Sequence, residues 1–293
     1  MKARQLWFRT ALGICILLFA MAAMAGPIPL SNPYVSTAVS NYGTLGSGGS
    51  TSPGLLYDPT GNSNYGNNDI LTPGDPFEGF YVSYNGILST GNNNDGSSAA
   101  FGVHSPTVSG NTVTWTGSNG ALSITNTYTL NGQTINIDTT LYALTNLSNV
   151  EFLRTLDPDP DVNMYGSYST NNVLVNNDEV VASGQYSGQT VGLYSDSSIA
   201  HSAGVSYWST IPGQYLEGTN VGDGDNTIGM AFNVGNMEQG SSVDLDYEYF
   251  VGATPNANSP VHVPTTTPEC GSMTLLISGL LGFLTLKRRN MSL

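Results

Sequence analysis

ALSITNTYTLNGQTINIDTTLYAL, residues 121–144, is the stretch of sequence that decides the fold. Apolar and polar residues alternate on both sides of Asn131-Gly132, a dipeptide that favours a two-residue type I′ turn because both central positions need positive φ. A hairpin with this turn pairs Leu130 with Gln133. One face then carries the large apolar side chains, as a one-sided core requires: Leu122, Ile124, Tyr128, Leu130, Ile135, Ile137 and Leu141.

Short alternating runs of the same kind recur along the chain, separated by turn residues. TVSGNTVTW (107–115) predicts a second tight hairpin about Gly110-Asn111. Further predicted strands are FEGFYVSYNG, VEFLRTLD, NVLVNN, EVVASGQ, QTVGLYS, GVSYWST and TIGMAFNVG. Helical spacing of apolar residues is always interrupted by Gly, Pro or Asn. We therefore expect an all-β chain that folds as a large antiparallel β-sandwich of about a dozen strands.

The last predicted strand, SSVDLDYEYFVGA (241–253), alternates strictly. Successive side chains of a strand point to opposite sides, so its apolar residues share one face: Val243, Leu245, Tyr247, Tyr249 and Val251. Asp244, Asp246 and Glu248 are expected to face solvent.

The first 25 residues are typical of a secretory signal peptide. A basic start, MKARQLWFRT, precedes the apolar run ALGICILLFAMAAMA, and Ala23 and Ala25 are the small residues that signal peptidase prefers before its cut. We favour cleavage after Ala25 over a retained membrane anchor, because Gly26-Pro27 disfavours a continuing helix. We therefore expect an N-terminal signal helix and export of the remaining chain.

A second apolar segment, MTLLISGLLGFLTL (273–286), lies near the C-terminus and is followed by Lys287, Arg288 and Arg289. It is shorter than the roughly 20 residues that a spanning helix prefers. A basic cluster after an apolar helix acts as a membrane stop and stays on the cytoplasmic side. We expect a short C-terminal hydrophobic helix that holds the chain in the membrane, with the body outside, before processing.

This ending resembles a PEP-CTERM sorting signal. A Val-Pro- and Thr-rich linker is followed by Pro268, Glu269 and Cys270, then by the apolar segment and the basic cluster. The resemblance, over about residues 264–290, implies a protein of a Gram-negative-type bacterium that is processed by an exosortase, a membrane cysteine transpeptidase. The third motif position is normally proline. Cys270 there is either a tolerated variant or the mark of a related tail that takes a lipid or uses another sorting enzyme.

The chain is thus divided into a signal peptide (1–25), a β-sandwich domain (26–252), a Pro/Thr-rich linker (253–267) and a PEP-CTERM-like sorting signal with a short transmembrane helix (268–290). Composition shows no break inside the sandwich domain, where the Gly/Ser-rich stretch 46–54 is expected to be a loop.

Charge is distributed very unevenly. Six of the seven Lys and Arg residues lie in the terminal segments, so residues 26–268 keep one cation, Arg154, and twenty carboxylates. So acidic a body excludes nucleic-acid binding, which depends on Lys and Arg that neutralise phosphates, and suits divalent cations. Cys15 and Cys270 also lie in the terminal segments, so the body has no disulfide, cysteine nucleophile or thiolate metal site.

Two acidic loops are candidate calcium sites, because Ca²⁺ is bound by several oxygens at about 2.4 Å. The first, LRTLDPDPD, carries Asp157, Asp159 and Asp161 at alternate positions, and the second, GDGDN, carries Asp223 and Asp225. Neither has the glutamate at the twelfth position that completes an EF-hand loop. The alternative for each is a polar loop or tight turn that needs no ion.

Arg154 is expected to form a structural ion pair, because it is the one cation of the body. Its candidate partners are Glu151, Asp157 and Asp159, the nearest carboxylates in the sequence. The functional alternative is a clamp for an acidic sugar or a substrate carboxylate.

Catalytic motifs are sparse. The sequence has neither a G-x-S-x-G elbow nor an H-E-x-x-H zinc helix, and no local motif supports a Ser-His-Asp triad. Carboxylate pairs for glycoside hydrolysis stay open, with Glu78, Glu151 and Glu217 as candidates. The aromatic residues Trp115, Tyr207 and Trp208 either stack on sugar rings or fill the core.

Together these features predict an exported, exosortase-sorted cell-surface or extracellular-matrix protein, a non-enzymatic β-sandwich that binds exopolysaccharide. The alternative is a carbohydrate-active enzyme on the same fold, namely a glycoside hydrolase, lyase or epimerase. Calcium is the one cofactor considered. The predicted partners are an exosortase-type transpeptidase, an extracellular polysaccharide and, before processing, the membrane. An exposed Trp or Tyr beside two close carboxylates in a cleft would favour the enzyme.

Overall fold

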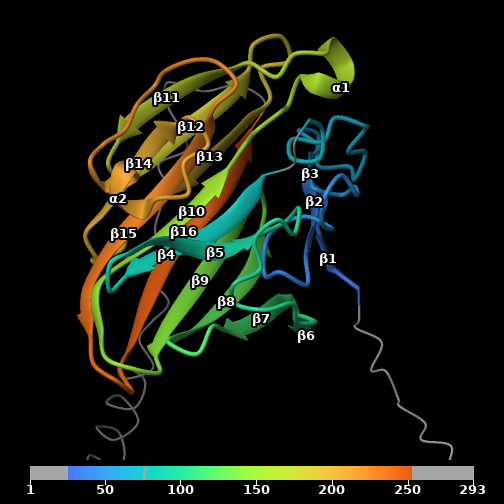
Figure 1. Ribbon diagram of the computed structural model, residues 1–293. Coiled ribbons are helices and arrows are strands. Elements are labelled where there is room, and N and C mark those ends of the chain that lie inside the picture. The colour runs from blue at the N-terminus through green and yellow to red at the C-terminus, as the bar shows by residue number, and fades with distance from the viewer. Residues whose placement is uncertain (1–25, 75–76, 253–293) are drawn as a thin grey trace, which may run out of the picture.

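The computed structural model describes residues 26–74 and 77–252, which form sixteen strands and two short helices (Figure 1). Antiparallel sheets pack as a sandwich, so the predicted all-β fold is confirmed. Within these residues no helix is long and apolar enough to cross a membrane. The predicted signal helix, linker and C-terminal helix lie outside the described residues and stay predictions.

Two large sheets form the layers of the sandwich. The first has eight strands in the order β11-β12-β13-β16-β9-β8-β7-β6, and the second has five in the order β14-β15-β10-β4-β5. The strands of the first sheet are β6 (Thr107–Ser109), β7 (Thr112–Ser118), β8 (Leu122–Asn131), β9 (Thr134–Ala143), β11 (Thr170–Asn176), β12 (Glu179–Gly184), β13 (Thr190–Tyr194) and β16 (Ser242–Gly252). Those of the second are β4 (Glu78–Tyr84), β5 (Ile87–Asn93), β10 (Leu147–Leu156), β14 (His201–Ser206) and β15 (Thr227–Met237).

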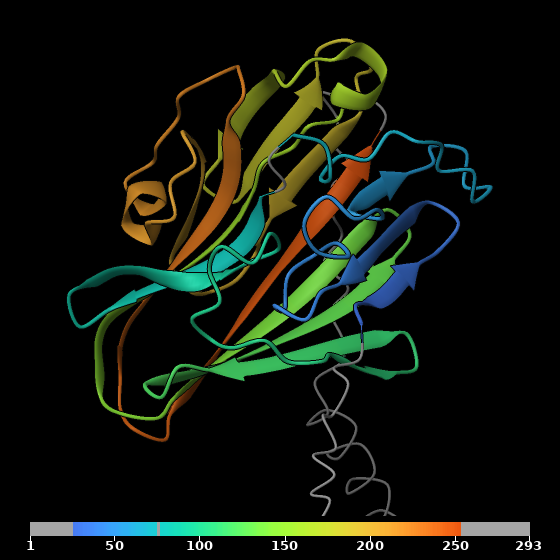
Figure 2. The same ribbon diagram turned by 45° about the vertical axis from the view of Figure 1, so that its right-hand side comes forward.

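A third, three-stranded sheet lies at one side of the sandwich (Figure 2). Its strands are β1 (Ile28–Ser31), β2 (Val35–Val39) and β3 (Leu55–Tyr57). The turn after β2 contacts the eight-stranded sheet. The Tyr128 hydroxyl donates to the Gly43 carbonyl at 2.6 Å, and Trp115 Nε1 donates to the Asn41 carbonyl at 2.9 Å. These bonds tie the N-terminal sheet to the sandwich.

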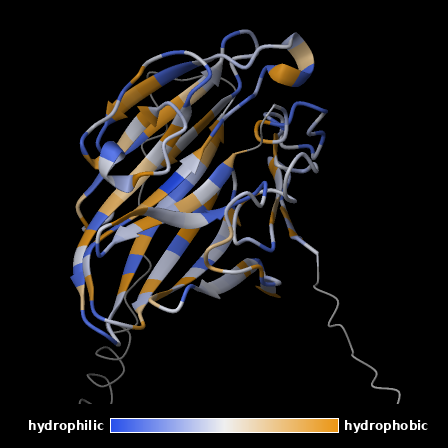
Figure 3. Cartoon of the chain, in the orientation of Figure 1, coloured by the Kyte–Doolittle hydropathy of each residue, from blue (hydrophilic) through white to orange (hydrophobic). Residues whose placement is uncertain are grey.

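The core lies between the two large sheets, whose strands alternate apolar and polar residues (Figure 3). Buried aromatic rings of the facing sheets contact one another. The Phe80 ring centroid lies 5.6 Å from that of Trp115, and the Phe152 centroid lies 6.1 Å from that of Tyr247. The apolar side chains of the alternating strands in both sheets therefore form the core.

The hairpin of residues 121–144 forms, but in a different register from the predicted one. Asn131 pairs with Thr134, so each strand residue faces the one two positions beyond its predicted partner. The two-residue loop is Gly132-Gln133, and Gly132 alone of the two has positive φ, +58°. Glycine in the first loop position suits a type II′ turn rather than the predicted type I′. A shift of two keeps the same side chains inward, because the side-chain period of a strand is two.

The remaining strand predictions have mixed outcomes. The second hairpin turns at Gly110-Asn111 as predicted. Glu248, predicted to face solvent, is only 5% exposed and pairs across strands with Tyr194 of β13, whereas Asp244 is exposed. Two single-turn helices, α1 (Val162–Tyr165) and α2 (Pro212–Leu216), were not predicted, because segments so short carry no helical period.

Candidate functional site

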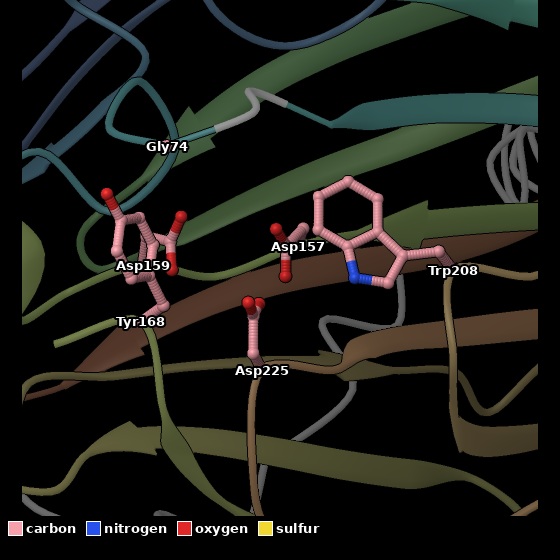
Figure 4. Close-up of a pocket in the computed structure, with 6 residues that line it drawn as sticks. All are labelled: Gly74, Asp157, Asp159, Tyr168, Trp208 and Asp225. Carbon is pink, nitrogen blue, oxygen red and sulfur yellow. The ribbon is translucent and has the colours of Figure 1, made fainter.

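The two predicted acidic loops meet at one end of the sandwich. Carboxylate oxygens of Asp157, Asp159 and Asp225 all lie within 4.8 Å of one another. Asp157 and Asp159 follow β10 and are 3% and 2% exposed, whereas Asp225 is exposed. Figure 4 shows the three carboxylates around a common space.

The loop after β10 is extended, and this conformation brings its first two aspartates together. The two prolines of the loop restrict its backbone. The N–H of Asp157 donates to the Phe77 carbonyl and that of Asp159 to the Ile70 carbonyl, both at 2.7 Å. Residues two apart in an extended chain point to the same side. The alternate spacing of the aspartates therefore suits convergence of Asp157 and Asp159.

Asp225 reaches the site from a loop that is anchored on β11. Thr170 and Gly224 exchange two backbone hydrogen bonds of 3.0 Å each. The Asp223 carboxylate accepts the backbone N–H of Asn172 at 2.8 Å. Asp223 therefore fixes the loop, and the structure does not place it in the group of three.

Asp161 also lies outside the group. It is fully buried, and its two carboxylate oxygens accept the backbone N–H groups of Tyr186 at 2.7 Å and Ser187 at 3.0 Å. Asp161 thereby joins the start of α1 to the turn between β12 and β13. Of the five predicted metal ligands, three converge and two anchor loops.

Gly74, Tyr168 and Trp208 complete a pocket of about 340 Å³ around the three carboxylates. Tyr168 and Trp208 stand on opposite sides of it in Figure 4. Gly74 has φ +71°, and a Cβ there would lie 2.5 Å from Asp159 Oδ2, so a larger residue would be strained and would displace this carboxylate. Trp208 has φ +54°, which is rare for a bulky residue. Its ring centroid lies 5.3 Å from that of Phe77.

Three carboxylates this close repel one another. Two unit charges 4.8 Å apart cost about 3 kcal/mol at an effective dielectric constant of about 20, and a bound cation would relieve that repulsion. Calcium–oxygen distances of about 2.3–2.6 Å allow oxygens of one shell to be about 5 Å apart. The geometry therefore fits Ca²⁺, and three carboxylates that each bind through one oxygen leave about three to five positions for other oxygens.

Arg154 is not part of this pocket. It forms a fully buried ion pair in which its Nε donates to Glu78 Oε1, so its partner is on the neighbouring strand β4 and is not Glu151, Asp157 or Asp159. Because Arg154 is 0% exposed, the clamp for an acidic sugar is ruled out. The predicted structural ion pair is confirmed, with a different partner.

The Glu78–Arg154 pair is held between the sheets by further contacts. Glu78 also accepts the Tyr249 hydroxyl at 2.9 Å and the Leu45 N–H at 2.7 Å. Burial raises the pKa of Glu78 above its ordinary value, although Arg154 and these hydrogen-bond donors act to lower it. Burial alone would lower the pKa of Arg154, but the Glu78 carboxylate raises it well above its ordinary value. The Arg154 guanidinium lies 5.6 Å from the Tyr128 ring centroid.

The other candidate residues are dispersed. Trp115 is a core residue with no exposure, whereas Tyr207 is 73% exposed. Glu151 accepts the Ser83 hydroxyl at 2.8 Å on the five-stranded sheet. Glu217 lines a second pocket. Glu78 is held in its buried ion pair with Arg154, which leaves it unavailable as a catalytic partner of Glu151 or Glu217.

Three features of the site were not predicted from the sequence. Gly74 and Tyr168 carried no motif, and the joining of the two acidic loops depends on contacts between distant segments. Trp208 was named only as a possible platform, because β14 was expected to run through it, whereas the strand ends at Ser206. The signals that were available are the two Asp-rich loops and the Tyr207-Trp208 pair.

No protein-family model matches the chain, and no curated protein matches it. A bacterial glucoamylase complexed with acarbose shares the fold, with a TM-score of 0.52 and 11% identity over 79% of this chain and 33% of the glucoamylase. A galactose mutarotase related enzyme from Lactobacillus acidophilus has a TM-score of 0.40 and 8% identity over 78% of this chain and 98% of that enzyme. A heparan sulfate lyase from Pedobacter heparinus has a TM-score of 0.39 and 9% identity over 80% and 38% of the respective chains. This chain spans about a third of the glucoamylase, and the likeness is one of fold.

Proposed function

We propose that this protein is an exported cell-surface or extracellular-matrix protein whose sandwich binds a polysaccharide through a calcium ion. The observation that carries the proposal is the convergence of Asp157, Asp159 and Asp225 between Tyr168 and Trp208. The carboxylates supply oxygen ligands, and the aromatic side chains supply apolar faces for sugar rings. The glucoamylase that shares the fold was solved with acarbose, which is compatible with a saccharide ligand.

A saccharide suits the open part of the cation's coordination shell. Three carboxylates around Ca²⁺ leave a net charge of −1, so a neutral hydroxyl is electrostatically preferred to another anion as the next ligand. Trp208 is fixed in a left-handed conformation, which costs of order 1–3 kcal/mol and persists at functional sites where the surroundings hold it. The pocket thus combines a charged centre with a preset aromatic wall.

Export is the second part of the proposal. It is supported by the apolar run with Ala23 and Ala25 before Gly26 and by the tail with Pro268, Glu269 and Cys270. In this account an exosortase-type enzyme processes the tail, and the body remains at the cell surface or in the matrix. Calcium sites of extracellular modules have dissociation constants of about 10⁻⁴–10⁻³ M, which a site with three carboxylates can match.

Calcium binding is tested by thermal melting and titration calorimetry with CaCl₂. We expect Ca²⁺ to raise the melting temperature of the wild type. In Asp157→Asn the calcium-dependent shift should be lost, while the calcium-free protein is as stable as wild type or more so, because one repulsive charge is removed. Asp223→Asn is the matched control, since its side chain can still accept the Asn172 N–H and should retain the shift. No shift in the wild type at millimolar Ca²⁺ would refute the cation site.

Saccharide binding is tested with a glycan array, with and without EDTA. The proposal expects binding that needs Ca²⁺ and is lost in Asp157→Asn. Binding that survives both EDTA and the substitution would place the saccharide elsewhere.

A carbohydrate-active enzyme is the second candidate function. It is favoured by the close carboxylates beside Trp208, since retaining glycosidases hold two carboxyl groups about 5–5.5 Å apart. The two candidates differ in turnover: an enzyme shortens or modifies the glycans that it binds, and Asp159→Asn should then abolish product formation. Intact glycans recovered after prolonged incubation would exclude it for those substrates.

A further inference from the structure

A second pocket, of about 430 Å³, lies at the end of β14 beside α2. The residues that line it are Ser206, Tyr207, Gln214, Glu217, Gly218, Thr219 and Val221. Its volume is in the range of small-molecule pockets, about 300–1,000 Å³. Neither the calcium site nor its aromatic walls include any of these residues.

The two pockets are built on the same two chain segments. Residues 206–208 contribute Tyr207 to the second pocket and Trp208 to the first, and residues 217–225 contribute Val221 to the second and Asp225 to the first. Val205, which immediately precedes the first segment, is hydrogen-bonded to the second: its N–H donates to the Thr219 carbonyl at 3.0 Å. The pockets are therefore built on adjoining residues just beyond the end of β14.

The backbone at Trp208 explains how adjacent aromatic residues can serve adjacent pockets. In an extended strand Tyr207 and Trp208 would point to opposite faces of the sheet. β14 ends at Ser206, and the left-handed φ of +54° at Trp208 breaks the alternation. The strained conformation of Trp208 thus allows Tyr207 to line the second pocket while Trp208 lines the first.

The chemistry of the second pocket suits a neutral, hydroxyl-rich ligand. Tyr207 is 73% exposed and offers an aromatic face. Ser206, Gln214 and Thr219 offer uncharged hydrogen-bonding groups, and Glu217 is the one charged residue among those that line the pocket. A phosphate or carboxylate ligand would meet a negative charge there with no cation to offset it among these residues.

We infer that the second pocket is a neighbouring subsite for the same saccharide chain, so that the ligand is a neutral polysaccharide of which at least two sugar units are bound. One unit lies at the Asp157–Asp159–Asp225 group and the next stacks on Tyr207. This inference rests on the proposed function and adds the class of ligand and the length that is recognised.

The test uses affinity gel electrophoresis of the protein in CaCl₂ with three polymers: a linear β-glucan, a galactomannan and the polyuronate alginate. The neutral polymers should retard the protein more than alginate does. Titration calorimetry then compares the monosaccharide with oligomers of the polymer that binds. We expect the oligomers to bind at least tenfold more tightly than the monosaccharide. Tyr207→Ala should weaken oligomer binding roughly tenfold, while the affinity for the monosaccharide and the calcium-dependent melting shift stay unchanged.

Tyr186→Ala is the matched control, because Tyr186 is 65% exposed and lines neither pocket. Its oligomer affinity should equal that of the wild type, and Tyr207→Trp should restore what Tyr207→Ala loses. The subsite alone is refuted if calcium-dependent binding exists but Tyr207→Ala binds oligomers like the wild type, or if only alginate binds. If no saccharide binds in CaCl₂, the proposed function and the subsite fail together.

Discussion

Replacing Glu78 by glutamine should destabilise the protein more than any comparable change of a surface carboxylate. Glu78 is fully buried and carries the negative charge opposite the buried Arg154 guanidinium. Arginine stays protonated in proteins, so Glu78→Gln leaves a cation in the core with no counter-charge. Removing one partner of a buried ion pair costs about 3–5 kcal/mol.

The hydrogen bonds of Glu78 keep the expected cost within that range. Glutamine keeps the shape but has one acceptor oxygen, which can still accept from Arg154 Nε and Tyr249, while its NH₂ group replaces the oxygen that accepts the Leu45 N–H. The loss is then electrostatic, together with one buried hydrogen bond. Since domains are typically stable by about 5–15 kcal/mol, even this cost is a large fraction of the total.

Arg154→Met should differ in its pH dependence. It removes the cation that opposes protonation, so the pKa of Glu78, already raised by burial, rises further in the folded state. A carboxyl whose folded pKa exceeds its unfolded value of about 4.3 costs stability above the folded pKa, and this cost disappears as pH falls toward the unfolded pKa. Relative to wild type, Arg154→Met should therefore recover stability as pH falls from the raised folded pKa of Glu78 toward its unfolded pKa, whereas Glu78→Gln should not.

Urea unfolding followed by tryptophan fluorescence measures both effects, because Trp115 lies in the core. Glu151→Gln is the control; Glu151 is on the same sheet but only partly buried, and its substitution should cost less than about 1 kcal/mol. The double variant Glu78→Gln/Arg154→Met should cost less than the sum of the single changes. The reasoning is refuted if Glu78→Gln lies within about 1 kcal/mol of wild type, or if both single variants show the same pH dependence.

Three further predictions concern other parts of the molecule. Partial burial, together with repulsion by its cross-strand partner Asp246, raises the pKa of Asp138 to about 6. Asp246→Asn removes this repulsion and should stabilise the protein at pH 8. The gain should be only about 1 kcal/mol, because Asp138 is solvent-exposed and water screens the repulsion. Urea unfolding should show the gain vanish near pH 4, as Asp138 becomes protonated in both the folded and the unfolded state. Gly74→Ala should abolish calcium binding in calorimetry while far-UV circular dichroism is preserved; an unchanged affinity contradicts the pocket geometry. Gly43→Ala should lower the melting temperature strongly, because its Cβ would lie 2.3 Å from the Trp115 ring; a change below about 1 kcal/mol would show that the ring can move.

The sequence predicted the features of the fold that depend on near neighbours. Alternation with period two identified the hairpin of residues 121–144 and its inward face, and glycine-containing dipeptides located its turn to within one residue. The register was wrong by two because Gly132, rather than Asn131, begins the loop. Local pattern alone does not distinguish these two turns, since both contain the same dipeptide.

The site depended on contacts that local patterns do not encode. The two Asp-rich loops were recognised separately, but their meeting follows from the pairing of β11 with the loop that contains Asp225. Arg154 was paired with nearby carboxylates in the sequence, whereas its partner Glu78 stands on the adjacent strand. The φ of Trp208 is set by its surroundings, and propensity alone would have excluded it.

Asp157 and Asp225, 68 positions apart in the chain, meet only after the strands between them have paired. A cation bound by both acts as a cross-link that closes a long loop, the role that a disulfide plays in many secreted proteins. Such an ion binds the native state and not the unfolded chain, so its concentration sets part of the folding free energy. If the proposed site binds calcium, the calcium concentration around this cysteine-free body contributes to its stability as the redox potential does for a disulfide-bonded protein.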